Sequence, residues 1–326
     1  MDSTEESADK IWTLLVNRHF DDFEEAAEMA RGWDVEFRQL QAGRSSTDVL
    51  QFGSPDFLVT RFSMDLAYDQ RGSTPPNMLT FAILDEDIRD TTTPEGAITP
   101  DGIWCFPACR EFAAASGAEF RGCTLSLSES LLDEVAKLHG LSDPRSALGS
   151  GKVVRCRRAD IDAIRHRLGG IYREMRNGGI GPRHPRQVNE LEFDLARRIL
   201  EALAGPSDFV HPKMTGRRQR VLRCALDYLE ANPKSPVTVS ELARVAGAGV
   251  RTLEYVFKDY FGVTPKAYLT ARRLVGARRE LLRSDAVSTR VQDAANNWGF
   301  WHLGQFSKDY RRFFGELPSR TLQKNS

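Results

Sequence analysis

The sequence lacks the features that would place it in a membrane. No stretch approaches the roughly 18 apolar residues that a membrane-spanning helix requires. The first ten residues are charged and carry no apolar run of the kind found in export signals. We therefore expect a cytoplasmic protein with no membrane partner.

Cysteine is scarce and has no pairing pattern. The chain has 5 cysteines, an odd number, and no Cys-x-x-Cys spacing, which argues against a disulfide framework and a structural zinc site. Cys105 and Cys109 form the one close pair. Burial as small apolar residues is their ordinary interpretation, and a redox switch is the alternative.

Signatures of catalysis are also missing. Residues 33–127 contain no histidine, whereas metal-dependent barrel enzymes hold their metal with histidines and a carboxylate. His19, His139 and His166 lack ligand spacing, and the chain has no Gly-x-Ser-x-Gly elbow or phosphate-binding glycine loop. The sequence therefore predicts a protein that is not an enzyme and needs no cofactor or metal.

The chain has no net charge, but its two parts differ strongly. Lys and Arg number 45 against 45 Asp and Glu. Residues 213–326 hold 21 Lys and Arg against 10 Asp and Glu, so the remainder is acidic by the same margin. A basic domain is typical of proteins that neutralise DNA phosphates, and it predicts salt-sensitive binding.

One layout occurs twice in the basic region. The first copy has Leu242, Ala243, Gly247, Leu253, Phe257, Phe261, Gly262, Pro265 and Leu269, and the second has Ala294, Ala295, Gly299, Phe306, Tyr310, Phe314, Gly315, Pro318 and Leu322. Each copy is typical of a short helix, a glycine turn, a second helix with apolar residues every three or four positions, and Gly-x-x-Pro opening a third helix. We predict two helix-turn-helix units, over about 238–261 and 290–314.

Local signals agree with these boundaries. Gly247 and Gly299 lie where the chain bends sharply between helices, which favours a residue able to adopt positive φ. Thr238 and Thr289, each followed three residues later by Glu or Gln, predict capping boxes. We call the second helix of each unit its recognition helix. Gly304 lies inside the recognition helix of the second unit, where glycine lowers helix stability by roughly 1 kcal/mol relative to Ala.

A long helical pattern over 265–283 joins the two units. About 19 residues at roughly 1.5 Å each make a rod near 28 Å, close to the roughly 34 Å between successive major-groove faces on one side of DNA. Its arginines, expected largely outward, are Arg272, Arg273, Arg278, Arg279 and Arg283. One chain would then place two recognition helices in adjacent major grooves of double-stranded DNA.

Residues 218–323 resemble the DNA-binding domain of the AraC/XylS family of bacterial transcription regulators. The segment 294–319, from Ala294-Ala-Asn-Asn-Trp-Gly-Phe to Gly315-Glu-Leu-Pro-Ser319, is similar to the family signature. The resemblance covers about a third of the chain. It implies an all-α domain of two helix-turn-helix units joined by a long helix.

Helix geometry selects the side chains expected to contact DNA. Those left facing outward or on the flank are Arg251, Thr252, Glu254, Tyr255 and Lys258 in the first copy, and Leu303, Gln305, Ser307 and Lys308 in the second. The resemblance puts Arg251, Glu254 and Tyr255 at base-reading positions. Arginine suits guanine, Glu254 suits a cytosine amino group, Gln305 suits adenine and Leu303 suits a thymine methyl.

A second group of basic residues is expected to contact phosphates, which fix register without reading sequence. It consists of Arg311, Arg312, Arg244 and Arg290. An ordinary solvated charge is the alternative interpretation for each of these arginines.

The N-terminal part predicts a different architecture. After an amphipathic helix over 21–32, short β-branched or aromatic runs occur at 34–40, 47–52, 57–62, 77–84, 102–105 and 120–127. Such spacing predicts an antiparallel barrel or jelly roll over about 33–127, the cupin-like architecture that AraC-type sensor domains often have. The expected fold class is therefore α+β.

Helices are expected at 131–139, 159–176 and 188–204, which completes a sensor or dimerisation domain over 1–205 with its helices at about 129–204. Their apolar stripes indicate packing inside that domain or, alternatively, a dimer interface. Residues 206–217 are expected to be a linker before the DNA-binding domain at 218–323.

Together these features predict a sequence-specific transcription regulator, an activator by the resemblance, controlled by a small-molecule effector in the N-terminal domain. A homodimer and a contact with RNA polymerase are further implications of the resemblance. Two alternatives remain open: a ligand-independent dimeric DNA-binding regulator, and a cupin-like enzyme domain fused to a DNA reader.

Overall fold

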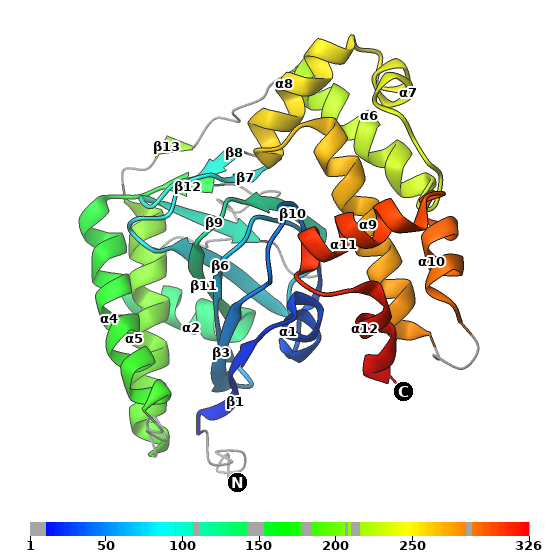
Figure 1. Cartoon of the computed structure of the whole chain (residues 1–326). Coiled ribbons are helices and arrows are strands. Elements are labelled where there is room, and N and C mark those ends of the chain that lie inside the picture. Colours follow the sequence, from blue (N-terminus) through cyan, green and yellow to red (C-terminus); the bar gives the residue numbers. More distant parts are fainter. Residues whose placement is uncertain are drawn as a thin grey trace, which may run out of the picture.

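The computed structural model consists of a β domain and a helical domain that lie side by side (Figure 1). It describes residues 11–94, 96–106, 111–141, 153–177, 184–205, 208–209, 216–284 and 289–325. We call the described part of 11–209 the β domain and that of 216–325 the helical domain. This division confirms the predicted α+β class.

Two antiparallel sheets form the centre of the β domain. The larger sheet consists, in spatial order, of β1 (Thr13–Phe20), β3 (Thr47–Ser54), β4 (Phe57–Met64), β11 (Phe120–Ser128), β6 (Met78–Leu84), β9 (Gly102–Phe106), β12 (Val153–Arg155) and β13 (Asp208–Phe209). The smaller consists of β2 (Asp34–Gln39), β5 (Tyr68–Ser73), β10 (Glu111–Ser116), β7 (Thr91–Thr93) and β8 (Gly96–Ile98). One apolar cluster takes residues from both sheets, so the sheets face one another.

All six predicted strands are present, but the predicted start of the β structure at residue 33 is wrong. Strand β1 precedes it and pairs along β3, from Thr13 opposite Gly53 to Phe20 opposite Thr47. Strand β5 was not predicted because its sequence, Tyr-Asp-Gln-Arg-Gly-Ser, is polar. Backbone pairing with β2 on one side and β10 on the other holds it in the sheet.

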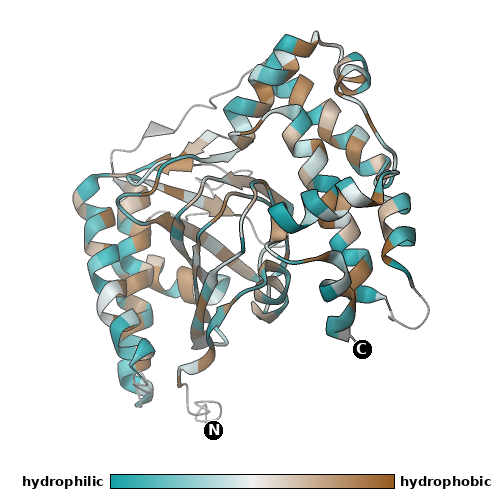
Figure 2. Ribbon diagram, in the orientation of Figure 1, coloured by the Kyte–Doolittle hydropathy of each residue, from teal (hydrophilic) through white to brown (hydrophobic). Residues whose placement is uncertain are grey.

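Helices cover the outer face of the larger sheet. They are α2 (Glu129–His139), α4 (Arg158–Arg176) and α5 (Pro185–Ala204), while α1 (Phe23–Met29) lies at the opposite side, next to the helical domain (Figure 1). The predicted stripes, such as Ile161, Ile164 and Leu168 on α4, pack into one core with β4, β6 and β11. In Figure 2, hydrophilic and hydrophobic residues alternate along the ribbons of these helices, as expected of helices with one buried face. Packing inside the domain is therefore the correct interpretation of the stripes.

The helical domain contains the repeat. Its elements are α6 (Arg217–Ala231), α7 (Val239–Val245), α8 (Val250–Phe261), α9 (Pro265–Arg283), α10 (Val291–Asn297), α11 (Leu303–Phe314), α12 (Pro318–Leu322) and a final 3-10 turn, η1 (Gln323–Asn325). Helices α7 and α8 form the first predicted unit, α10 and α11 form the second, and α9 connects them.

Three expectations concern features that the sequence lacks. Within the described ranges, no helix is long and apolar enough to cross a membrane. The same residues contain no group of three or more His, Cys, Asp and Glu that could hold a metal ion. Cys105 is completely buried, and this burial raises the pKa of its thiol above the ordinary value, as expected of a small apolar core residue. Cys109 and most of the expected linker 206–217 lie outside the described residues.

Candidate DNA interface

The first helix-turn-helix unit is built around a capped helix and a glycine turn. Thr238 accepts a hydrogen bond from the amide of Glu241 at 3.2 Å, which confirms the first predicted cap. Gly247 has φ of +64°, in the left-handed region that favours glycine. Behind the turn, Leu253 and Phe257 of α8 are completely buried. Helix α8 starts at Val250, and the residue before it, Gly249, provides no side-chain cap.

Helix α8 leaves its predicted reading residues at the surface. Arg251, Glu254, Tyr255 and Lys258 are exposed, and Thr252 is half-buried. The Arg251 guanidinium lies 5.8 Å from the centre of the Tyr255 ring and donates a hydrogen bond to its hydroxyl at 3.3 Å. Arg251 and Tyr255 lie one helical turn apart, so this contact orients the Arg251 guanidinium without pairing it with a carboxylate.

The second unit repeats this geometry, with one correction. Gly299 has φ of +74°, but the cap of α10 lies one residue after Thr289, where it was predicted. Its cap residue is Arg290, whose amide donates to the carboxylate of Asp293 at 3.3 Å. The capping box predicted from Thr289 to Gln292 is therefore wrong.

Helix α11 also presents its expected residues outward. Gln305 and Lys308 are exposed, whereas Leu303 and Ser307 are half-buried. The Gln305 amide donates to Asp309 at 3.1 Å, so reading adenine would require it to leave this partner or share it. Sequence reasoning missed Trp301, a large apolar side chain in the turn before α11 that is 69% exposed. An exposed aromatic ring next to a recognition helix identifies Trp301 as a candidate contact residue.

The expected phosphate contacts are accessible. Arg244, Arg290, Arg311 and Arg312 are all exposed. They come from both units, near the starts or ends of short helices. Arg312 forms an ion pair with Asp309 at 3.2 Å.

Helix α9 contradicts one prediction. Its apolar face is inward as expected, but Arg272 and Arg278 are buried instead of facing solvent. Arg272 donates to the carbonyl oxygens of Leu229 and Asn232 at the end of α6. The long side chain of an arginine can cross an apolar surface to reach such partners. The helical pattern of α9 alone does not show that other elements cover the side of the helix that carries these arginines.

A close approach joins the second unit to α9. A side chain at Gly276 would lie 2.3 Å from the ring of Trp298, so only glycine fits beside this indole. The Trp298 N–H donates to Glu280 at 3.0 Å. The Trp298 ring, packed against the backbone of α9 at Gly276, therefore holds the second unit against α9.

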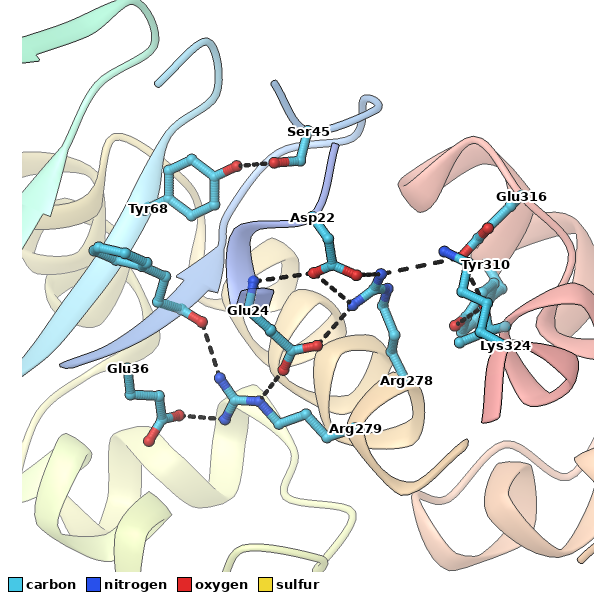
Figure 3. A network of polar contacts seen from close by, with 12 residues as sticks. Asp22, Glu24, Glu36, Ser45, Tyr68, Arg278, Arg279, Tyr310, Glu316 and Lys324 are labelled. Carbon is cyan, nitrogen blue, oxygen red and sulfur yellow. Dashed lines mark hydrogen bonds and ion pairs between the residues drawn. The ribbon is translucent and has the colours of Figure 1, made fainter. Parts of the chain in front are cut away.

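The β domain covers another part of α9, and its carboxylates face Arg278 and Arg279 (Figure 3). Arg278 donates to Asp22 at 2.5 Å and to Glu24 at 2.6 Å, and its side chain is only 5% exposed. Its guanidinium also lies over the ring of Phe23, 5.5 Å from the centre. Arg279 donates to Glu24 at 2.5 Å and pairs with Glu36. We call Arg278, Arg279, Asp22, Glu24 and Glu36 the α9 ion-pair cluster.

Other interdomain contacts extend this interface along both recognition helices. The carbonyl oxygen of Phe313, near the end of α11, accepts from the Gly43 amide at 3.0 Å and from Gln39 at 3.1 Å. Helix α8 contacts β7 and β10. Tyr268 of α9 donates to the buried Asp69 at 2.8 Å. The β domain therefore holds parts of both units, while Arg251 and Gln305 remain exposed.

The cluster also determines how its carboxyl groups ionise. Burial opposes ionisation of Asp22 and Glu36, but hydrogen bonds and charge from Arg278 and Arg279 outweigh it, so the pKa of each is lowered. For Glu24, burial outweighs the same two arginines and the pKa is raised. Among these three carboxyl groups, Glu24 is therefore the one whose ionisation the folded protein opposes.

The helical domain is similar in sequence to known regulators. Residues 242–324 match the family model described as a helix-turn-helix domain. The probable thc operon regulatory protein of Rhodococcus erythropolis is 42% identical over 103 residues, which cover 32% of this chain and 31% of that protein. The XylDLEGF operon transcriptional activator 1 of Pseudomonas putida is 34% identical over 141 residues, 43% of this chain and 41% of that protein.

Solved structures with comparable identity include the following example. It is a probable AraC family transcriptional regulator from Rhodopseudomonas palustris, 37% identical, and the match covers 32% of this chain and 96% of that one with a TM-score of 0.30. The chain thus spans less than half the length of both curated relatives above. The residues that match the family model, 242–324, lie in the helical domain, so this domain is a helix-turn-helix domain of the AraC type.

Proposed function

We propose that this chain is a sequence-specific transcription regulator that reads two adjacent major grooves of DNA and responds to a small-molecule effector in its β domain. One observation carries the proposal. Two recognition helices in one chain present exposed polar side chains at matching positions, while their other faces are packed into the domain.

Base reading is assigned to both helices. On α8, Arg251 pairs with guanine and Glu254 accepts from cytosine, with Thr252, Tyr255 and Lys258 beside them. On α11, Gln305 reads adenine and Leu303 meets a thymine methyl, with Ser307 and Lys308 beside them. The half-buried position of Leu303 suits a contact made by a methyl group.

Phosphate contacts are assigned to Arg244, Arg290, Arg311 and Arg312. All four are exposed, and contacts with phosphates position a protein without reading sequence. The excess of positive charge in residues 213–326 supports this assignment.

The interdomain contacts supply the physical link for control by an effector. The β domain contacts α8, α9 and the end of α11, so a shift in the β domain changes how the two recognition helices are placed relative to each other. An effector acts through this link to the extent that it binds one arrangement more tightly than the other. A ligand-independent regulator would keep the same contacts as a fixed scaffold.

The wider assignment follows the family. Activation of transcription is named for the Pseudomonas putida relative, and we extend activation, a homodimer, contact with RNA polymerase and a cytoplasmic location to this chain as parts of the proposal. An enzyme domain fused to a DNA reader is the weakest alternative, because the β domain has no histidine in residues 33–127.

Mapping the genomic fragments that the purified full chain retains, at low and raised salt, tests the proposal. The expected result is a small set of sites with a two-part motif whose halves lie about one helical turn apart. A variant with Arg251→Ala and Gln305→Ala is the matched control, and it should lose this motif. Uniform, salt-labile coverage that is the same for both proteins would contradict sequence-specific reading.

A further inference from the structure

The two facing sheets enclose an apolar cavity of about 60 Å³. Strands of both sheets contribute its aromatic lining, which includes Phe37, Phe62, Trp104, Phe106, Phe112 and Phe120. No Asp, Glu, Lys, Arg or His is among its described lining residues. A charged molecule entering this space would lose its hydration without gaining a counter-ion, so the lining selects against charge.

Two lining residues carry buried hydrogen-bonding atoms without a partner. They are the indole Nε1 of Trp104 and the hydroxyl oxygen of Thr91, each unpaired within the described part of the chain. The residues are only 5% and 2% exposed. Leaving such groups unpaired costs free energy, and buried polar groups in native proteins usually have partners.

Other polar groups in the same lining are already engaged. Thr60 accepts from Gln51 at 2.9 Å and from the Trp33 indole at 3.2 Å. Gln70 donates to Ser116 at 3.0 Å. Among the described lining residues, the buried hydrogen-bonding atoms without a partner are therefore the N–H donor on Trp104 and the hydroxyl on Thr91.

We infer that this cavity takes a small uncharged organic molecule with an apolar body and a hydrogen-bond acceptor, which Trp104 and Thr91 recognise. The inference rests on the proposed function, because it names the chemical class of the effector. The cavity is smaller than the roughly 150 Å³ that admits benzene in an engineered core. Phe112 and Phe120 are half-buried, and the inference requires these rings to turn outward when a molecule of that size binds.

Nuclear magnetic resonance of the indole N–H groups in the full chain tests this class directly. The probes are pyridine and benzene, which have the same shape but differ in one acceptor atom, and benzoate, which is charged. The experiment is run at mildly alkaline pH, where pyridine is uncharged. Pyridine should shift the Trp104 N–H signal, assigned with Trp104→Phe, in a saturable way, benzene should bind more weakly, and benzoate should not bind.

Thr91→Val tests the hydroxyl with little change of shape. Pyridine has one acceptor lone pair, which the Trp104 N–H and the Thr91 hydroxyl would share, so removing the hydroxyl should weaken pyridine binding about two- to tenfold and leave benzene binding unchanged. The matched control is Thr92→Val, because the side chain of the next residue in a strand points to the opposite face and Thr92 does not line the cavity. It should bind pyridine as the unmodified chain does.

The outcomes separate this inference from the proposed function. Equal binding of pyridine and benzene would remove the role of the acceptor, and binding of benzoate in preference to pyridine would overturn the uncharged class. No binding by any of the three probes would overturn the inference, because the cavity would then admit neither the acceptor nor its apolar counterpart. Loss of sequence-specific DNA retention by the full chain contradicts the proposed function instead, whatever the probes do.

Discussion

Arginines on two surfaces of the helical domain have opposite environments. On α9, Arg272 and Arg278 are buried, and Arg278 is held by two carboxylates of the β domain. On the recognition helices, Arg251 and Arg311 are exposed and lie outside the α9 ion-pair cluster. The difference teaches that positive charge alone does not identify a DNA contact, because the same residue type serves an internal interface and an open surface.

The largest effect, on the free energy of unfolding, is expected from removing a buried arginine at the interface between the two domains. Arg278→Ala removes one guanidinium and leaves Asp22 and Glu24 buried together, which should cost about 3–5 kcal/mol of unfolding free energy. Arg311→Ala, its exposed counterpart, should change stability by no more than about 0.5 kcal/mol. Urea denaturation followed by tryptophan fluorescence measures both. Similar values for the two variants would erase the contrast between the surfaces.

The open surface should respond in DNA binding instead. Arg251→Ala should weaken binding to the preferred site by about 1–3 kcal/mol and relax the preference at one base pair. Gln305→Ala should act in the same way at a different base pair, less strongly because its amide already has Asp309 as a partner. Titrations against a set of single-base variants of the site check this. A loss that is equal for every sequence would reassign both residues to phosphate contacts.

Arg311 sharpens the division between reading and anchoring. Arg311→Ala should weaken binding to all sequences alike and reduce the slope of log affinity against log salt by about 1. Binding measured over a range of salt concentrations gives this slope, with Arg251→Ala as the comparison. A change of base preference in the Arg311 variant would contradict its role as an anchor.

The smallest effect is expected from acid. Asp22 and Glu36 have lowered pKa values, so the stability they contribute is present above their ordinary pKa of about 4 and is lost as the pH falls through their folded-state pKa. Glu24, with its raised pKa, opposes them, because its protonation favours the folded state. The net loss in acid should therefore be modest. In Glu24→Gln the loss should be larger, and denaturation curves at neutral and acid pH test this.

The recognition helices illustrate how far sequence patterns reach. Apolar residues three and four positions apart predicted the buried faces of α8 and α11, and so left Arg251 and Gln305 outside, as the structure has them. Such a pattern works because each helix packs against its own neighbours. The same reasoning failed for Arg278, because the partner that buries it, Asp22, is 256 residues away in the chain.

The β domain shows the same limit. Strands with β-branched and aromatic runs, such as β4 and β6, were predicted, whereas the polar strand β5 was not. Pairing of β5 depends on backbone hydrogen bonds to two strands distant in sequence. The unpaired groups of Trp104 and Thr91 were equally invisible, since a missing partner is a property of the packed interior.

The sequence by itself determined the two helix-turn-helix units, their turns at Gly247 and Gly299, and the residues that face outward, because these depend on local propensity and helical period. Only the tertiary structure decided which arginines of α9 bind the β domain, how the two sheets enclose a cavity, and which polar atoms inside lack partners. Those properties arise where distant segments meet, and their free energy depends on burial and on the groups brought together by the fold.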